Sequence, residues 1–346
     1  MIFDVILKLR QWYAKIIHFE YWNVYFFYAP IALYVFFLGI KSRALAFFTA
    51  VNPAMALSGV VGANKSRLLL KVPSDYLPRT LLLKSVADIL PQQILDEAGL
   101  CFPLICKPDN GERGRMVQKV ANIEQLNAYR DVLKEPFIIQ EYIDYPLELG
   151  IFYYKMPDKS GSGIVSIVQK RFLTVKGDGQ SRLCDLLWRN QRAVMAWNVL
   201  KKEWQEQWQQ IVPNGVEWLI QPIGNHWRGT EFMNANHLIN SQLVDVFDRI
   251  TASIDGFHYG RFDLRVPDLE NLYGGKNIKI MEINGVESEA GHIYDTKMSL
   301  RQAYGDTAKN MRLMCRIAQQ NKAMGVPIMP FFETIKTIRQ YLKQYA

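Results

Sequence analysis

The chain has 346 residues, of which 49% are hydrophobic and 21% are charged. This composition is typical of a globular protein with one large or two to three small domains, and it excludes a largely disordered chain. Its four cysteines show no C-x-x-C spacing and have no histidine at zinc-site distance. A disulfide framework and a zinc site are therefore not expected, and a reducing compartment fits best.

The positive charge is concentrated near the N-terminus. Residues 1–71 hold eight Lys or Arg against two Asp or Glu, so most of the net charge of +8 lies in the first fifth of the chain. This segment also contains an uncharged apolar run from Val24 to Ile40, which follows several aromatic residues, Trp12, Tyr13, Tyr21 and Trp22. Aromatic and basic flanks are typical of helices at a membrane surface. We therefore predict that residues 1–45 associate with a membrane.

Three placements of the apolar run stay open: it spans the bilayer, it lies in the interface, or it is buried in the fold. Its 17 residues are at the short end for a crossing, and Pro30 interrupts them. A cleaved signal peptide is disfavoured because the run begins late and Lys41 and Arg43 follow it. Nucleic acid is not an expected partner, because the basic residues accompany an apolar run and no RNA or DNA motif occurs.

Beyond residue 45 the chain alternates short apolar runs with helical segments. Residues 46–98 are predicted to form a small mixed unit, and strand-like runs separated by turns predominate from residue 99, with a helix over 122–133. The spacing of Trp197, Trp204 and Trp208 predicts a helical packing stripe. Residues 306–346 are predicted to be helical. The fold class is therefore α+β with antiparallel strands.

Two alternating runs late in the chain carry acidic residues. "YGRFDLRV" and "NIKIMEIN" are separated by turn-forming residues. Alternation along the second run predicts that Ile278, Ile280, Glu282 and Asn284 share one face. If the two runs form a hairpin, Asp263 in the first run lies opposite Glu282.

Asp263, Glu282 and Asn284 together offer three oxygen ligands. Oxygen donors without His or Cys favour Mg²⁺ over zinc, and a Mg²⁺ ion with few protein ligands usually completes its coordination with phosphates and water. The alternative is structural, with Glu282 in a cross-strand ion pair with Arg261 or Arg265.

A second group of residues is suited to binding a nucleotide. Lys107 ends an apolar strand and precedes a loop with Gly111 and Gly114, which favours phosphate binding although the spacing is not that of a P-loop. Further along, the strand that ends at Gln140 could offer backbone groups to an adenine, and Glu148 follows at a spacing suited to ribose hydroxyls.

The order of these motifs resembles a known family. They are Lys107 in "FPLICKP", "QEYI", Glu148 in "LELG", Asp263 in "GRFDLR" and Glu282-x-Asn284 in "MEING". Over about residues 50–305 this order resembles the ATP-grasp superfamily, most closely the D-alanine–D-alanine ligase-like carboxylate–amine ligases. "VKGDGQSRLCDLL" and "LPRT" are similar to further segments of such proteins.

The resemblance implies an ATP-grasp fold, in which two α+β subdomains clasp ATP. The small subdomain would be 99–145 and the large one 146–305, with the metal site. A pre-ATP-grasp unit at 46–98, an apolar N-terminal helix within 1–45, and C-terminal helices at 306–346 would complete the chain.

The resemblance also implies roles for individual residues. The phosphates or the adenine of ATP would contact three lysines, Lys65, Lys107 and Lys170. The adenine would lie at a hinge formed by Gln140, Glu141, Tyr142 and Ile143. The ribose would contact Glu148. Lys71 competes with Lys65 for its position. Asp263, Glu282 and Asn284 would hold two Mg²⁺ ions, with Mn²⁺ as the alternative metal.

The implied reaction joins a carboxylate to an amine. The carboxylate attacks the γ-phosphate of ATP, and the amine then attacks the resulting acyl phosphate. Cationic groups are needed because two anions must meet in the first step. Arg261 matches the family's arginine beside the metal ligands. Asn225 and Arg228 in "GNHWRGTEF" are further catalytic candidates, and an ordinary surface turn is the alternative for that segment.

The segment after the metal strand departs from D-alanine ligases. "GVESEAGHIYD" stands where those enzymes have a Ser/Pro/Gly-rich segment. Its Glu287 and Glu289 predict a cationic or amine-bearing acceptor, and His292 is a candidate base or a structural histidine. D-alanine is therefore not the expected substrate.

The sequence thus predicts an ATP-dependent carboxylate–amine ligase that acts on small molecules at the cytoplasmic face of a cell membrane, as a monomer or a homodimer. The alternatives are an ATP-grasp phosphotransferase and a membrane-bound nucleotide-binding protein without catalysis.

Overall fold

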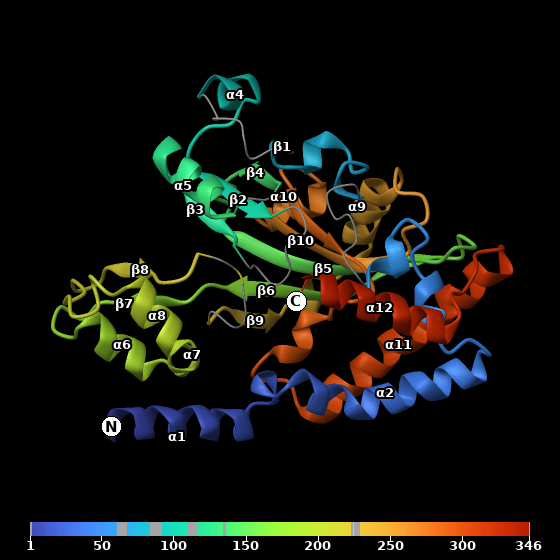
Figure 1. Cartoon of the computed structure of the whole chain (residues 1–346), viewed down its shortest axis with the longest axis horizontal. Helices are drawn as coiled ribbons and strands as arrows, with labels where there is room; N and C mark the ends of the chain where they lie inside the picture. The colour runs from blue at the N-terminus through green and yellow to red at the C-terminus, as the bar shows by residue number, and fades with distance from the viewer. Residues whose placement is uncertain are drawn as a thin grey trace. The chain divides into compact units, whose positions relative to one another are not determined.

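Two compact units make up the computed structural model, which describes residues 2–60, 68–83, 92–108, 116–133, 136–222, 224 and 229–345. The predicted α+β class is confirmed, since both units combine helices with antiparallel strands (Figure 1). Each unit combines segments that are far apart in the sequence, and the predicted domain boundaries stay predictions. Unit 1 comprises Met1–Tyr34, Val168–Ala235 and Gly291–Ala308, and unit 2 comprises Val35–Ile167, Asn236–Ala290 and Lys309–Ala346.

Unit 1 is mostly helical. Its strands form two short antiparallel pairs, in which β7 (Thr174–Lys176) pairs with β8 (Glu217–Leu219), and β9 (Glu231–Asn234) pairs with the last four residues of β6 (Ser162–Arg171). Its helices are α1 (Ile2–Ile17), η1 (Phe19–Tyr21), α6 (Leu183–Arg189), α7 (Gln191–Met195), α8 (Trp197–Glu203) and η7 (Gly291–Tyr294), with the first parts of α2 (Val24–Lys41) and α11 (Leu300–Ala323).

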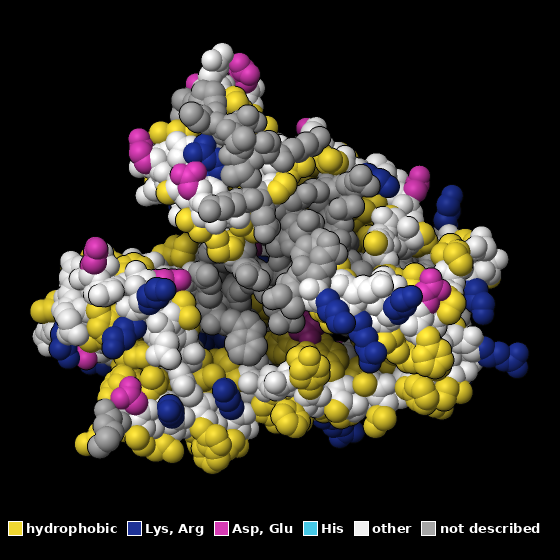
Figure 2. Space-filling model, viewed as in Figure 1, with side chains coloured by type: hydrophobic (Ala, Val, Ile, Leu, Met, Phe, Trp, Pro, Cys, Tyr) yellow, Lys and Arg dark blue, Asp and Glu magenta, His cyan; other side chains and the backbone are white. Residues whose placement is uncertain are grey.

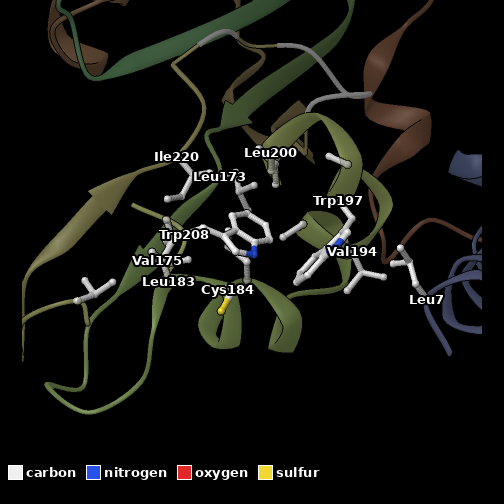
Figure 3. Close-up of a cluster of buried hydrophobic side chains, with 14 residues drawn as sticks. Leu7, Leu173, Val175, Leu183, Cys184, Val194, Trp197, Leu200, Trp208 and Ile220 are labelled. Atoms are coloured by element: carbon white, nitrogen blue, oxygen red, sulfur yellow. The ribbon is translucent and has the colours of Figure 1, made fainter. Parts of the chain in front are cut away.

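Tryptophan rings dominate one core of unit 1 (Figure 3). Trp197 and Trp208 are buried and pack edge to face, with their ring centroids 5.0 Å apart. Trp188 packs against Trp197 in the same way, at 5.2 Å. The predicted packing role is confirmed for Trp197 and Trp208, which are both buried in this core. The predicted helical arrangement of the tryptophans is wrong, however, because α8 ends at Glu203, so that Trp204 and Trp208 lie in the turns that follow it.

α1 attaches to this core along one narrow side. Leu7 is buried within the cluster. The Arg10 guanidinium donates to the carbonyl of Trp188 at 2.7 Å and lies 4.5 Å from the centre of its ring. Gln11 donates to the carbonyl of Val194 at 2.9 Å. These contacts fix the helix to the unit while most of its other residues stay exposed.

A second core of unit 1 contains Phe27 of α2. Its ring stacks on Phe19 and on Tyr304, with centroid distances of 5.8 and 5.0 Å. Next to this aromatic cluster in the sequence, Glu20 forms a buried ion pair with Arg192 at 3.0 Å. Because both partners are removed from water, loss of either would leave an uncompensated buried charge.

Among the described residues, α2 is the one helix long and apolar enough to cross a membrane by length and composition, a test that core helices of globular proteins also pass. Its mean hydropathy is 1.7, and 22% of the helix is buried. Phe27 and Ile31 are buried, whereas Tyr25, Phe26 and Leu33 are 74% to 81% exposed. The two sides of this uniformly apolar helix therefore have different surroundings.

The first sheet of unit 2 has the strand order β1-β4-β2-β3, which are Thr80–Leu83, Phe137–Glu141, Leu104–Pro108 and Gln118–Val120. On one face, Cys106 and Ile139 are buried in a cluster with side chains of α4 (Gln92–Glu97) and α5 (Ile123–Leu133). Because side chains alternate along a strand, Lys107 and Gln140 point to the opposite face.

The second sheet of unit 2 places β10 (Tyr259–Val266) between β11 (Lys279–Asn284) and β5 (Leu147–Lys155), with β6 beside β5. Phe262 of β10 is fully buried and packs edge to face on Phe247 of α9 (Ser241–Thr251), at 5.2 Å. The other described elements of unit 2 are η2 (Phe47–Ala50), η3 (Ala56–Gly59), η4 (Ser74–Tyr76), η6 (Asn236–Leu238), α10 (Leu269–Gly274), the later parts of α2 and α11, and α12 (Phe331–Tyr345).

Neighbouring phenylalanines of α2 should differ sharply in their contribution to stability. Phe27→Ala should lower the free energy of unfolding by about 3–5 kcal/mol, because it leaves a cavity between two aromatic rings. Phe26→Ala, at a residue that is 76% exposed, should change it by less than about 0.5 kcal/mol. Urea unfolding followed by tryptophan fluorescence measures both values. Equal losses would mean that α2 packs through a different side.

Candidate active site

β10 and β11 bring four polar side chains to one face of their sheet. In the antiparallel ladder Asp263 lies opposite Glu282, and Arg261 lies opposite Asn284. Opposite residues of such a pair point to the same side. The position of Asp263 against Glu282 is as the sequence predicts, although the connection between the strands contains the short helix α10.

A β-bulge in β11 turns Ile280 to the face opposite to the predicted one. The register shifts after Asp263, so that Ile280 lies opposite Leu264, and both are fully buried on the other side of the sheet. The prediction that Ile280 shares a face with Glu282 was therefore wrong, because Met281 is an extra residue in the ladder. A bulge leaves backbone groups unpaired. The Met281 carbonyl accepts a hydrogen bond from Lys107 Nζ at 3.2 Å.

The polar face is held together around one carboxylate oxygen. Arg261 Nη2 and Nε donate to Oδ2 of Asp263 at 3.0 and 3.2 Å, and Asn284 Nδ2 donates to the same oxygen at 3.2 Å. Asp263 and Asn284 are each only 4% exposed. Burial lowers the pKa of the Arg261 guanidinium, but attraction by Asp263, Glu282 and Glu289 outweighs it and raises the pKa above its ordinary value. The positive charge of Arg261 is therefore secure.

The donor chemistry of this face fits Mg²⁺. Asp263, Glu282 and Asn284 supply carboxylate and amide oxygens, the ligand atoms that Mg²⁺ prefers. Within the described ranges, no three His, Cys, Asp or Glu side chains gather closely enough to enclose a metal by themselves. A metal on this face would therefore take further oxygens from phosphate or water, which is the usual case for Mg²⁺ at nucleotides.

Lys107 connects the two sheets of unit 2. Its Nζ donates to Oε1 of Gln140 at 3.1 Å, in addition to its bond to Met281 of β11. Gln140 in turn donates to Oγ1 of Thr80 at 3.1 Å. The ammonium group thus lies between the sheet that carries the predicted adenine strand and the strand that carries the predicted metal ligands. The glycine loop that follows it, with Gly111 and Gly114, lies outside the described residues.

Arg265 is a site residue that the sequence analysis did not assign. Its guanidinium forms an ion pair with Glu148 at 2.9 Å, and both side chains are 7% exposed. It also donates to the Ile143 carbonyl at 2.6 Å and lies 5.7 Å from the ring centre of Tyr142. Glu148 is thus an ion-pair partner of Arg265. The ribose role of Glu148 stays a prediction.

The predicted adenine hinge is fixed at both ends. Glu141 accepts a hydrogen bond from the backbone N–H of Arg79 at 3.1 Å. Lys119 lies 3.6 Å from the ring centre of Tyr142. Arg265 holds the next residue, Ile143, through its carbonyl. The hinge therefore contacts β3, β10 and the residue that precedes β1.

Asn52 anchors the start of β10 and was also missed by the sequence analysis. It is fully buried, and its Nδ2 donates to the carbonyls of Tyr259 at 2.7 Å and Ser58 at 3.3 Å. Its Oδ1 accepts from the N–H groups of His258 and Tyr259, at 2.8 and 2.9 Å. Nearby, a Cβ at Gly285 would lie 2.3 Å from the Ser58 carbonyl oxygen, so only glycine fits there.

Not all predicted site residues fall in unit 2 or among the described residues. Glu287 is exposed at the end of the metal strand, and the Glu289 carbonyl accepts from Arg261 Nη1 at 3.2 Å. Lys170 and His292 belong to unit 1, where Lys170 lies opposite Phe232 and His292 Nε2 is 3.3 Å from Oδ2 of Asp306. Three further candidates, Lys65, Asn225 and Arg228, lie outside the described residues.

Replacing the buried amide of Asn52 should destabilise unit 2. Asn52→Asp keeps the shape but turns a carboxylate oxygen toward two carbonyls, so it should lower the free energy of unfolding by about 3 kcal/mol or more. The control is Asn122→Asp, since Asn122 is exposed and its side-chain oxygen accepts a hydrogen bond from the Gln125 amide at 3.0 Å, which a carboxylate can also accept. Urea unfolding followed by circular dichroism gives both values. An Asn52→Asp variant with an unchanged free energy of unfolding would argue against this anchor.

His258 should make the protein sensitive to acid. Burial, with a smaller effect of Lys155, lowers the pKa of His258 from 6.5 to about 4. The unfolded chain therefore takes up this proton more readily, so the stabilisation is complete above pH 6.5 and is lost as the pH falls toward 4. Measured by urea unfolding, His258→Asn should show a flatter pH dependence across this window. An unchanged slope would place the acid sensitivity elsewhere.

Residues 60–151, which include Lys107, Gln140 and Glu148, match the model of the tubulin-tyrosine ligase family. No curated protein sequence matches the chain.

Several solved structures are similar. A bifunctional glutathione synthetase from Pasteurella multocida has a TM-score of 0.39 and 14% identity, over 72% of this chain and 35% of that one. D-alanine–D-alanine ligase from Bacillus anthracis has a TM-score of 0.41 and 16% identity, over 75% of this chain and 65% of that one. The ATP-grasp ligase PsnB has a TM-score of 0.37 and 11% identity, over 72% of this chain and 60% of that one.

The chain spans 35% to 65% of the length of these three proteins. One of the three, PsnB, is described as an ATP-grasp ligase, the superfamily that the sequence motifs resemble.

Proposed function

We propose that the chain is an ATP-dependent ligase that joins a carboxylate to an amine through an acyl phosphate. The observation that carries the proposal is the ladder register, which gathers Arg261, Asp263, Glu282 and Asn284 on one face. A fixed cation from the other sheet, Lys107, reaches the same strand through the Met281 carbonyl. Oxygen ligands and a nearby ammonium are what positioning of a nucleotide triphosphate requires.

In the proposed first step, a carboxylate oxygen bonds to the γ-phosphorus while the bond to the β-phosphate oxygen breaks and ADP leaves. Mg²⁺ ions held by Asp263, Glu282 and Asn284 would neutralise phosphate charge. Lys107 supplies a further positive charge, and the hinge at 140–143 with Glu148 orients the nucleoside. In the second step an amine nitrogen attacks the acyl carbon, phosphate leaves and the amine proton is lost to water. Arg261 stabilises the developing oxyanion.

The proposed acceptor is an amine-bearing small molecule. Glu287 is exposed and Glu289 is half-buried at the end of β11, on the chain segment that directly follows the metal ligands. Their carboxylates favour a cationic group, whereas a second anionic acceptor would be repelled. His292, Asn225 and Arg228 remain candidates for contacts with the reacting groups, and Lys65 and Lys170 for contacts with ATP.

The proposed place of work is the cytoplasmic face of a cell membrane. The support for this is the group of large apolar residues that α1 and α2 expose within residues 1–45. Whether the working form is a monomer or a homodimer does not affect the chemistry above.

Removing the charge of Glu282 should abolish turnover. Glu282→Gln keeps the size of the side chain but weakens metal and phosphate binding, so Mg²⁺-dependent ADP release should fall by about 10²-fold or more. Glu270→Gln, at an exposed residue of α10 between the same two strands, should behave like the wild-type protein. ADP release is measured with pooled carboxylic acids, with and without pooled amines.

The same assay separates the candidate activities. Release that requires both pools supports the ligase. A stable phosphorylated product formed without amine would indicate a phosphotransferase instead. Equal release by wild-type protein and Glu282→Gln would refute the role assigned to Glu282 and with it the proposed metal site. No release by either protein would leave nucleotide binding without catalysis and would refute the proposed chemistry.

A further inference from the structure

α1 exposes a continuous apolar side although it belongs to a folded unit. Leu9, Trp12, Tyr13 and Ile16 are 51% to 63% exposed, and their helical spacing places them together. Figure 2 shows hydrophobic side chains gathered over the region of α1 and α2. Soluble monomers rarely leave a contiguous apolar surface of this kind open, so the side is expected to meet a partner.

The other two sides of α1 have different characters. One side is occupied, since Leu7 and Ala14 are buried and Arg10 and Gln11 donate to backbone carbonyls of unit 1. The last side is charged and exposed, and carries Lys8 and Lys15 together with one acidic residue, Asp4. By helical spacing these lysines flank the apolar side, because Lys8 precedes Trp12 by one turn.

This arrangement excludes a lengthwise insertion of α1 into a bilayer. The hydrogen bonds of Arg10 and Gln11 hold the helix along the surface of unit 1. A helix of 16 residues is also only about 24 Å long, less than the roughly 30 Å of the hydrocarbon layer. Only one side of the helix is available to lipid.

We propose that α1 lies flat in the interface of an anionic lipid bilayer, with Trp12 and its apolar neighbours below the headgroups and Lys8 and Lys15 at the level of the phosphates. The inference rests on the proposed membrane location and not on the proposed reaction. Tryptophan and tyrosine prefer this depth of a bilayer, and lysines next to them add electrostatic attraction to anionic lipids.

The charges favour lipid over a second copy of the chain. Two copies that met antiparallel through the apolar sides of α1 would place the lysines of both copies along the same edge of the contact. An anionic surface instead complements Lys8 and Lys15, and residues 1–71 as a whole carry a strong positive excess. The exposed Tyr25 and Phe26 at the start of α2 would add interfacial aromatic contacts in the same unit.

The test is co-sedimentation of the full chain, without ATP, with vesicles of neutral phosphatidylcholine and with vesicles that also contain phosphatidylglycerol. Binding to the anionic vesicles should weaken at least tenfold in the variant with Trp12→Ser and Ile16→Ser. Phe332→Ser, at an 84% exposed residue of α12, is the matched apolar control and should bind like wild type. Thermal unfolding should be unchanged in all of them, because every altered residue is exposed.

Charge is tested by a second matched pair. Lys8→Gln with Lys15→Gln should lower affinity for anionic vesicles by about fivefold per lysine, with little effect on neutral ones. Lys276→Gln with Lys322→Gln removes the same charge from exposed positions of unit 2 and should stay within about twofold of wild type. Alkaline carbonate should release the bound protein, because a flat helix is not integral.

Three outcomes would overturn the proposal. The first is that the wild-type chain binds neither the neutral nor the anionic vesicles. The second is that the variant with Trp12→Ser and Ile16→Ser binds anionic vesicles as tightly as wild type. The third is that the protein stays on the vesicles after alkaline carbonate, which would indicate a spanning segment. A concentration-dependent dimer in sedimentation velocity that the Trp12 variant loses would assign this side to a second copy. Since no nucleotide is present, none of these outcomes depends on whether the chain is a ligase.

Discussion

The register between β10 and β11 is the constraint on which the candidate site depends. Because side chains alternate, a slip of one residue would move Asp263 and Glu282 to opposite faces of the sheet. Apolar residues on the other face prevent this slip, since Phe262, Leu264, Ile280 and Ile283 are all fully buried. The carboxylates are thus positioned by the hydrophobic pattern around them. The bulge at Met281 has two effects. It turns Ile280 into the core, and it leaves the Met281 carbonyl to accept a hydrogen bond from Lys107.

Charge compensation completes the site. Asp263 is buried in a face that also carries Glu282, so two carboxylates there would repel each other without a cation. Arg261 provides that cation, two residues away on the same strand. Further along β10, Arg265 and Glu148 form a second, fully enclosed pair. The strand therefore alternates acid and base along one face, and a metal would enter a surface whose charge is already partly balanced.

The sequence predicted the local part of this arrangement and missed the distant part. Alternation and the hairpin spacing were enough to place Asp263 opposite Glu282, and the strand before Lys107 was evident from its apolar residues. No local pattern marks Asn52 as an anchor for Tyr259, 207 residues away, or Arg265 as the partner of Glu148, 117 residues away. The bulge was also missed, because one extra residue in a strand leaves composition and spacing almost unchanged.

Periodicity has a similar limit in α1 and α2. It identifies apolar sides but does not tell which of them meets protein. In α1 the broad apolar side stays exposed, while the narrow side with Leu7 and Ala14 is buried. In α2, where nearly every residue is apolar, Phe27 is buried and Phe26 is exposed. Tertiary contacts made the distinction.

The tryptophan core has a consequence for spectroscopy. All eight tryptophans of the sequence fall within the residue ranges of unit 1, and none falls within unit 2. Excitation at the red edge of protein absorption therefore reports on one unit alone, while the peptide signal in the far ultraviolet reports on both. Two unfolding curves recorded on one sample can separate the stabilities of the two units without dividing the chain.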